Sequence, residues 1–132
     1  MQIFPDGSIY EGWFKSDAAH GKGRLIHANG YIYEGDWKGD KAEGYGVYTN
    51  LDGSRYEGTF LNDKQHGNGV EIWPDGSCYS GNYAEGLKHG QGKFSWPDGS
   101  SYDGEFHDSK FDGTGEYRWG DGRLYFGEWV AN

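Results

Sequence analysis

Aliphatic side chains, cysteine and proline are all scarce in this sequence of 132 residues, and each shortage narrows the class of protein. The hydrophobic fraction is only 34%, whereas aromatic residues reach 18%, so a core built mainly of Leu, Ile and Val is not expected. Aromatic rings must supply most of the buried area, because each ring buries a large surface. The single cysteine, Cys78, has no partner for an internal disulfide. A disulfide scaffold is therefore excluded, and we expect a reducing, intracellular and cytoplasmic setting.

Long apolar runs and basic charge are also lacking. No stretch approaches the roughly 18 apolar residues that predict a membrane span, and no secretory or transit signal is recognisable. The 12 basic residues are outnumbered by 21 acidic ones, which gives a formal net charge of −9. Nucleic acids and anionic lipids both favour basic partners. We therefore expect no nucleic-acid partner, and a weak or secondary role for membrane lipid.

What the sequence does have is a strict repeat of 23 residues, which we number from a recurring tyrosine. Position 3 is always glycine and position 5 always aromatic, and positions 12, 14 and 21 are glycine in every complete unit. A fixed period of this length indicates an array in which each unit packs on its neighbours. We divide the chain, as one array, into a partial unit at 1–9, full units at 10–32, 33–55, 56–78, 79–101 and 102–124, and a partial unit at 125–132.

Each unit is too short for a strand–helix–strand crossover, and its alternating, glycine-rich, aromatic pattern is typical of strands. The phrase "WPDGS", from Trp73 to Ser77, has the composition of a three-residue hairpin turn. We therefore predict an all-β fold, in which about a dozen antiparallel strands form one elongated, twisted, solenoid-like sheet of β-hairpins. Across the odd-numbered turn, Trp73 shares a face with Tyr79, Gly81 and Tyr83. One face then carries the aromatic rings together with most of the recurring glycines, and a ring can lie flat over bare backbone. The opposite face is mostly polar.

The units "YEGDWKGDKAEGYGVYTNLDGSR" and "YEGTFLNDKQHGNGVEIWPDGSC" resemble the MORN repeat (membrane occupation and recognition nexus). The resemblance covers essentially the whole chain. It implies a non-enzymatic scaffold for protein–protein interaction, with partners among cytoskeletal, ciliary or membrane-junction proteins. An alternative that the resemblance also implies is a regulatory or targeting arm of a larger enzyme, such as a phosphatidylinositol phosphate kinase or a SET-domain methyltransferase, with phospholipid contact.

No set of residues predicts catalysis, a cofactor or a metal. The recurring aspartates lie in turns, and an active site is one constellation rather than five copies of one. The Gly-x-Gly pairs lie inside expected strands with no helix following, unlike a phosphate-binding loop. His20, His66 and His89 share position 11 and could bind a metal as a stack, but a role in loop geometry is the simpler interpretation.

The aromatic face is the most informative feature for function. Its rings either form only a thin core or leave part of the face open as a groove for a partner helix or extended peptide. We expect an open groove centred on the middle and C-terminal units, with Trp73 and Trp96 as its main binding residues. Self-association through ends that lack polar caps is a further possibility. The partner-binding set that we predict is Phe60, Trp73, Tyr79, Tyr83, Phe94, Trp96, Phe106 and Trp119.

A first prediction follows from the acidic balance. Attraction to an anionic bilayer contributes about 1 kcal/mol per Lys or Arg near the surface. In this chain, loop lysines such as Lys41 and Lys64 directly follow Asp40 and Asp63. After sedimentation with phosphoinositide vesicles at physiological salt, the protein should remain in the supernatant. Strong pelleting would show that lipid is a primary ligand.

Overall fold

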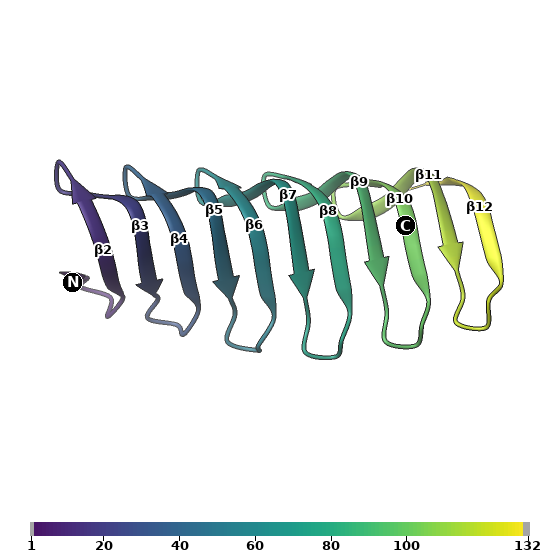
Figure 1. Ribbon diagram of the computed structural model, residues 1–132, viewed down its shortest axis with the longest axis horizontal. Helices are drawn as coiled ribbons and strands as arrows, with labels where there is room; N and C mark the ends of the chain where they lie inside the picture. Colours follow the sequence, from purple (N-terminus) through teal and green to yellow (C-terminus); the bar gives the residue numbers. More distant parts are fainter. Residues whose placement is uncertain (1, 131–132) are drawn as a thin grey trace.

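The computed structural model describes residues 2–130 and has the predicted all-β architecture: one open sheet in which every strand pairs antiparallel with the next strand in the chain. The hairpins follow one another along a single axis, from the N-terminal to the C-terminal end (Figure 1). Within the described residues there is no helix that could span a membrane. The 12 strands are β1 Gln2–Ile3, β2 Ile9–Lys15, β3 Ala18–Ile26, β4 Ile32–Lys38, β5 Lys41–Thr49, β6 Arg55–Leu61, β7 Lys64–Ile72, β8 Cys78–Ala84, β9 Leu87–Ser95, β10 Ser101–His107, β11 Lys110–Arg118 and β12 Leu124–Trp129.

The three-residue turns at one edge of the sheet have the predicted geometry. The Trp73 amide donates to the Ser77 carbonyl at 3.0 Å, and the Gly76 amide donates to the Trp73 carbonyl, also at 3.0 Å. Gly76 has φ of 93°, a left-handed conformation that glycine adopts without strain. The Asp75 carboxylate accepts a hydrogen bond from the Ser77 amide at 2.8 Å. This turn fixes which residues of a hairpin share a face.

The turns at the other edge contain two residues, both with positive φ. In the hairpin of β6 and β7, Asn62 has φ of 51° and Asp63 has φ of 68°. A two-residue turn of this kind matches the right-handed twist of the strands that it connects, and Asn, Asp and Gly tolerate it best. The sequence indicates a short polar loop here, but its length becomes clear only from the pairing of Leu61 with Lys64.

The core is a row of rings that we call the inner ladder, made of the aromatic residues at positions 1 and 5. The four central members Tyr33, Tyr56, Tyr79 and Tyr102 are at most 3% exposed. Neighbouring rings meet edge to face: Tyr56 lies 5.1 Å from both Phe60 and Tyr83, centroid to centroid. Edge-to-face pairs of aromatic rings are favourable beyond the area that they bury. Contacts of this kind join every hairpin to the next.

The rings lie over glycine, as the sequence predicts for positions 3 and 14. A Cβ atom built on Gly69 would lie 2.6 Å from the Cζ atom of Tyr56, and one built on Gly58 would lie 2.6 Å from the Cα atom of Gly69. No side chain fits at either position. The tyrosine ring therefore occupies the space that these two glycines leave.

The glycines at position 12 have a different role from the one that the sequence suggested. Each hairpin closed by a two-residue turn contains a bulge. In the hairpin of β6 and β7, three residues of β7, 66–68, lie opposite the single residue Thr59 of β6. Position 12 is the middle residue of the bulge and takes positive φ, as in Gly67 at 83°. The hydroxyl of the position-1 tyrosine donates to the carbonyl of the residue opposite the bulge, as Tyr56 does to Thr59 at 2.8 Å. The bulge thus explains why position 1 is tyrosine rather than phenylalanine.

A substitution at Gly69 tests the ring-over-glycine packing. Gly69→Val places a branched side chain in the space of the Tyr56 ring, and overpacking of this kind costs about 1–3 kcal/mol. Thermal melting should show a clearly lowered midpoint. Asn68→Ala, at an exposed neighbouring position, is the control and should melt nearly as the wild type does. An unchanged midpoint for Gly69→Val would contradict this account of the core.

The buried tyrosines predict loss of stability at alkaline pH. Burial raises the pKa of Tyr79 from 10.0 to about 12, and it also raises the pKa of Tyr33, Tyr56 and Tyr83. Unfolding exposes the phenols, which then ionise near their ordinary pKa. The stabilisation is therefore complete below pH 10.0 and is lost as the pH rises toward about 12. Thermal melts combined with phenolate absorbance test this, and titration of every tyrosine near pH 10.0 in the folded protein would contradict it.

Candidate functional site

A second row of rings, which we call the outer ladder, lies on the same face as the inner ladder but nearer the three-residue turns. Its rings come mainly from positions 16 and 18, and they are only partly buried or exposed. In the C-terminal half, Phe94 lies 5.3 Å from Trp73 and 4.6 Å from Trp96, and Trp96 lies 5.6 Å from Tyr117. The full outer ladder is His27, Tyr31, Tyr48, Trp73, Phe94, Trp96, Tyr117 and Trp119.

A groove runs between the two ladders, and the residue at position 10 determines how far it is filled. This residue pairs with the position-5 ring of the same hairpin, as Ala42 does with Trp37 and Lys88 does with Tyr83. The side chain at position 10 becomes larger from the N-terminal units to the C-terminal units. The series is Ala19, Ala42, Gln65, Lys88 and Phe111.

Two hollows lie in this groove over the first units, where position 10 is alanine. The first, of about 490 Å³, includes Phe4, Tyr10 and Ala19 in its lining. The second, of about 290 Å³, includes Ala42, Tyr31 and Tyr48. Both are lined by Leu25, Trp37 and Asp40, so they adjoin each other.

Over the later units, side chains of the protein itself occupy the equivalent place. The Lys88 Nζ atom lies 5.2 Å from the ring centroid of Trp73 in the outer ladder and 5.3 Å from that of Tyr79 in the inner ladder. Burial lowers the pKa of Lys88, and the negative charge of Glu71 acts in the opposite direction. One unit further on, Phe111 stacks on Tyr102 at 4.0 Å.

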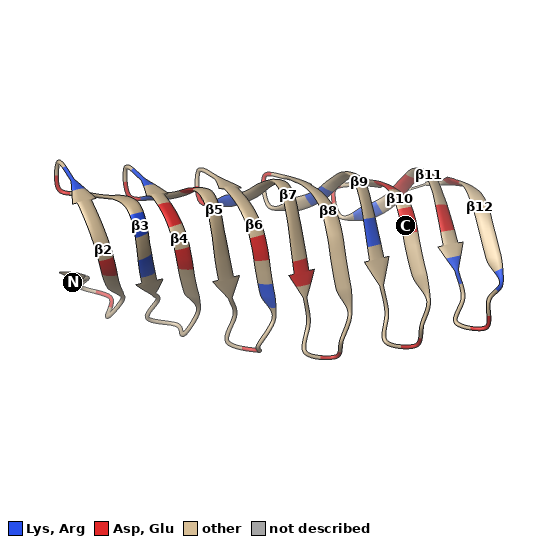
Figure 2. Cartoon of the chain, in the orientation of Figure 1, with Lys and Arg blue, Asp and Glu red and all other residues tan. Residues whose placement is uncertain are grey.

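Acidic residues border the open part of the groove. The Asp40 carboxylate accepts a hydrogen bond from the Ala19 amide at 2.6 Å, and Asp63 accepts one from the Ala42 amide at 2.7 Å. These bonds brace each hairpin against the preceding one. In the next two units the equivalent residues are Gly86 and Ser109, which carry no charge. Acidic residues, drawn in red, also lie in turns at both edges of the sheet (Figure 2).

The partner-binding set predicted from the sequence divides into two groups in the structure. Four of its members belong to the inner ladder and are almost fully buried: Phe60, Tyr79, Tyr83 and Phe106, at 0–6% exposure. Such side chains offer a partner little surface. The other four belong to the accessible outer ladder: Trp73, Phe94, Trp96 and Trp119.

From the sequence we expect the groove over the middle and C-terminal units, where the rings are most numerous, whereas the two hollows described above lie over the N-terminal units. The informative signal is the size of the residue at position 10, because a small side chain there leaves the groove open. Ala19, Ala42, Tyr31 and Tyr48 line the hollows but are not in the predicted set for this reason.

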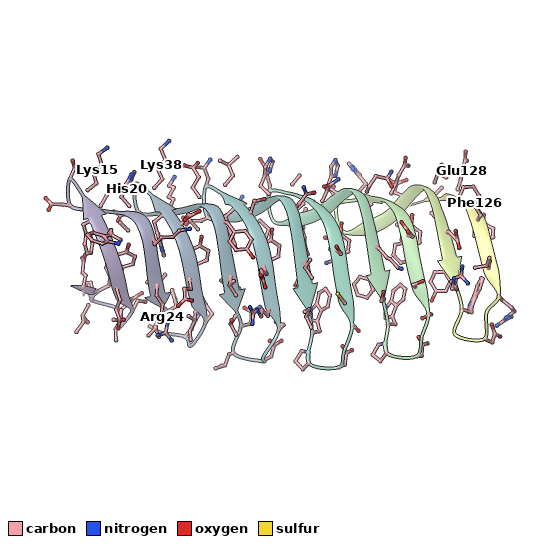
Figure 3. All side chains as sticks on the ribbon, in the orientation of Figure 1. Lys15, His20, Arg24, Lys38, Phe126 and Glu128 are labelled. Carbon is pink, nitrogen blue, oxygen red and sulfur yellow. The ribbon has the colours of Figure 1, made fainter. Side chains whose placement is uncertain are left out.

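The position-11 histidines lie away from the groove. Strand alternation places them on the opposite face from the position-10 residue, and Figure 3 shows His20 at the edge where the two-residue turns lie, near Lys15 and Lys38. Among the described residues, His89, His107 and Asp108 bring three potential metal ligands within 4.8 Å of one another. This group is at the protein surface, where His107 and Asp108 approach to 3.7 Å.

These features define a class: an open, single-layer array of β-hairpins with an aromatic groove along one face. The family model described as MORN repeat matches five times, at residues 10–30, 33–55, 56–78, 79–101 and 102–122. The chain therefore belongs to the MORN-repeat family. The comparison with curated protein sequences gives no match.

Among solved structures, the chain is similar to the TCP domain of SAS-4 (dCPAP) from Drosophila melanogaster, solved in complex with a proline-rich motif of Ana2 (dSTIL). The TM-score is 0.59 at 17% sequence identity, and the match covers 96% of this chain and 69% of that one. The likeness is one of fold.

Proposed function

We propose that this protein is a non-enzymatic scaffold that docks an extended segment of a partner protein in the groove between its two ladders. The observation that carries the proposal is the opening of this groove over the first two units, where alanine stands in place of lysine or phenylalanine. An aromatic-lined groove suits an extended or polyproline-II peptide, which is ordered before it binds and so loses little entropy.

The frame around the groove is built of packed aromatic rings and supports this role. The floor is made of inner-ladder rings such as Trp37 and Phe60, which are at most 8% exposed. The rim is made of Tyr31 and Tyr48, which stack at 4.9 Å, and of His27, which stacks on Tyr31 at 4.2 Å. Aromatic side chains contribute large contact area with few rotatable bonds, which is why they are frequent at interface hot spots.

The SAS-4 TCP domain, whose fold is similar, provides independent support, because it was solved in complex with a proline-rich motif of Ana2. A cytoskeletal setting for the present chain is an extension of that likeness and of the family resemblance. The docking proposal applies equally to a free-standing array and to an array that serves as the regulatory arm of an enzyme.

The test compares three classes of peptide by titration calorimetry: proline-rich, amphipathic helical, and flexible Gly/Ser-rich. The proline-rich class should bind most tightly. Tyr48→Ala should weaken that binding by about 2 kcal/mol, because it removes a ring from the rim. Val70→Ala removes an exposed apolar side chain from the opposite face and should leave the affinity unchanged.

Circular dichroism must first show that both variants retain the β-sheet. If the folded Tyr48 variant binds as tightly as the wild type does, the groove is not the docking site. If no peptide of the proline-rich class binds, the proposed function is wrong.

A further inference from the structure

The fourth full unit shows what the groove accepts. There the space between the ladders is occupied by a cation, Lys88, which lies over Trp73, Tyr79 and Tyr83 at 5.2–6.0 Å. A cation over aromatic faces is attracted by their negative electrostatic potential, and more strongly where water is partly excluded. The carboxylate of Glu71 contributes a negative charge to the same place, and its Oε1 atom accepts a hydrogen bond from the Tyr83 hydroxyl at 2.7 Å.

The first two units also combine aromatic rings with negative charge, but they lack the cation and use other residues. Phe4 and His27 stand in the place of Trp73, and the charge comes from aspartates rather than from the position of Glu71. Ala19 and Ala42 stand where Lys88 stands, and the carboxylates of Asp40 and Asp63 line the hollows. Asp6 lines the first hollow as well. Each space is therefore framed for a positive charge that the chain does not supply.

The negative charges of these carboxylates raise the pKa of nearby tyrosines. Burial raises the pKa of Tyr31, and the charges of Asp63 and Asp6 raise it further. Burial and the charge of Asp40 do the same for Tyr10. A cation placed beside these rings would face a favourable potential at both hollows.

We propose that the two hollows are seats for two cationic side chains, Arg or Lys, which stand three residues apart on one polyproline-II segment of the partner. This inference rests on the proposed function and adds the side chains and the spacing that the groove selects.

The spacing follows from two periods. Adjacent strands lie about 4.8 Å apart, so equivalent points on successive hairpins lie about 9.6 Å apart. A polyproline-II helix advances about 3.1 Å per residue and has three residues per turn. Residues three apart therefore lie on the same side of the peptide, about 9.3 Å from each other. The two periods agree closely.

Trp37 adds an independent observation at the boundary of the two seats. It lines both hollows, and its indole N–H is buried without a hydrogen-bond partner among the described residues. A buried unpaired donor is costly and calls for an explanation. A polyproline-II peptide presents backbone carbonyls along its length, and these are acceptors of the kind that this indole N–H lacks.

The experiment uses the full chain and proline-rich peptides that differ only in charged residues. One peptide has two arginines three residues apart, a second has glutamine at both places, and a third has the arginines two residues apart. The first should bind about tenfold more tightly than either of the others, since only it places a cation in both seats. Its affinity should fall with added salt more steeply than that of the glutamine peptide.

Substitutions in the protein test the same point. Asp40→Asn and Asp63→Asn remove charge but keep an oxygen that can accept the alanine amide, so each should weaken the arginine peptide severalfold and leave the glutamine peptide unaffected. Ala42→Lys fills the second seat as Lys88 fills its own, and should weaken the arginine peptide about tenfold. Val70→Lys changes the net charge equally on the opposite face and should have little effect.

The outcomes separate the two proposals. If arginine and glutamine peptides bind equally, and Tyr48→Ala weakens both, the groove docks peptides but has no cation seats, and this inference is wrong. If Ala42→Lys and Val70→Lys weaken binding equally, only the net charge matters, and the inference is again wrong. If no proline-rich peptide binds, both proposals fail. A shift of the Trp37 indole resonance with the arginine peptide supports the seats.

Discussion

The structure depends on one contact, the tyrosine ring of each unit lying over two paired glycines. The ring of Tyr56 fills the space beside Gly58 and Gly69, and its hydroxyl donates to the carbonyl of Thr59, which lies opposite the bulge of β7. The edges of the same ring meet Phe60 of its own unit and Tyr83 of the next. A single side chain therefore joins the two strands of a hairpin, fixes the bulge and links successive units. This explains how a sequence so poor in aliphatic residues can form an ordered sheet.

Because that contact is satisfied by positions 1, 3, 5 and 14, other positions are free to differ between units without loss of the fold. Position 10 changes from alanine to lysine and phenylalanine along the array, and position 8 changes from aspartate to glycine and serine. Both positions border the groove. The frame is thus repeated strictly, whereas the lining varies, and the variation is where specificity for a partner can reside.

The sequence allowed the fold to be predicted in detail, because a strict period and an odd-numbered turn determine the strands and their faces. The matching of Trp73 with Ser77, the aromatic face and the ring-over-glycine packing all follow from those two facts. The bulge could not be predicted, since it depends on the pairing of Gly58 and Phe60 with β7 rather than on any local signal.

The accessible part of the aromatic face was harder to predict than the fold. Tyr79 and Trp96 are equally aromatic in the sequence, but one is fully buried and the other only partly so. Burial depends on which neighbours cover a ring, and these come from other hairpins. Alanine at position 10 has no chemical signature of a binding residue. Its importance lies in the space that it leaves, and that space is defined only once the surrounding rings are in place.

The period of the array also bears on the kind of partner that it selects. An α-helix brings residues to one side every seven residues, a rise of about 10.5 Å, so its contacts would drift against seats about 9.6 Å apart. A helix with its side chains is also about 10–12 Å wide, whereas the groove here is bordered by rings that stack directly on one another, such as Tyr31 on Tyr48. A polyproline-II segment is slimmer, and its rise over three residues, about 9.3 Å, nearly equals the spacing of successive hairpins, about 9.6 Å. The two cation seats proposed over the first two units are thus matched in geometry to an extended segment with two basic residues three apart.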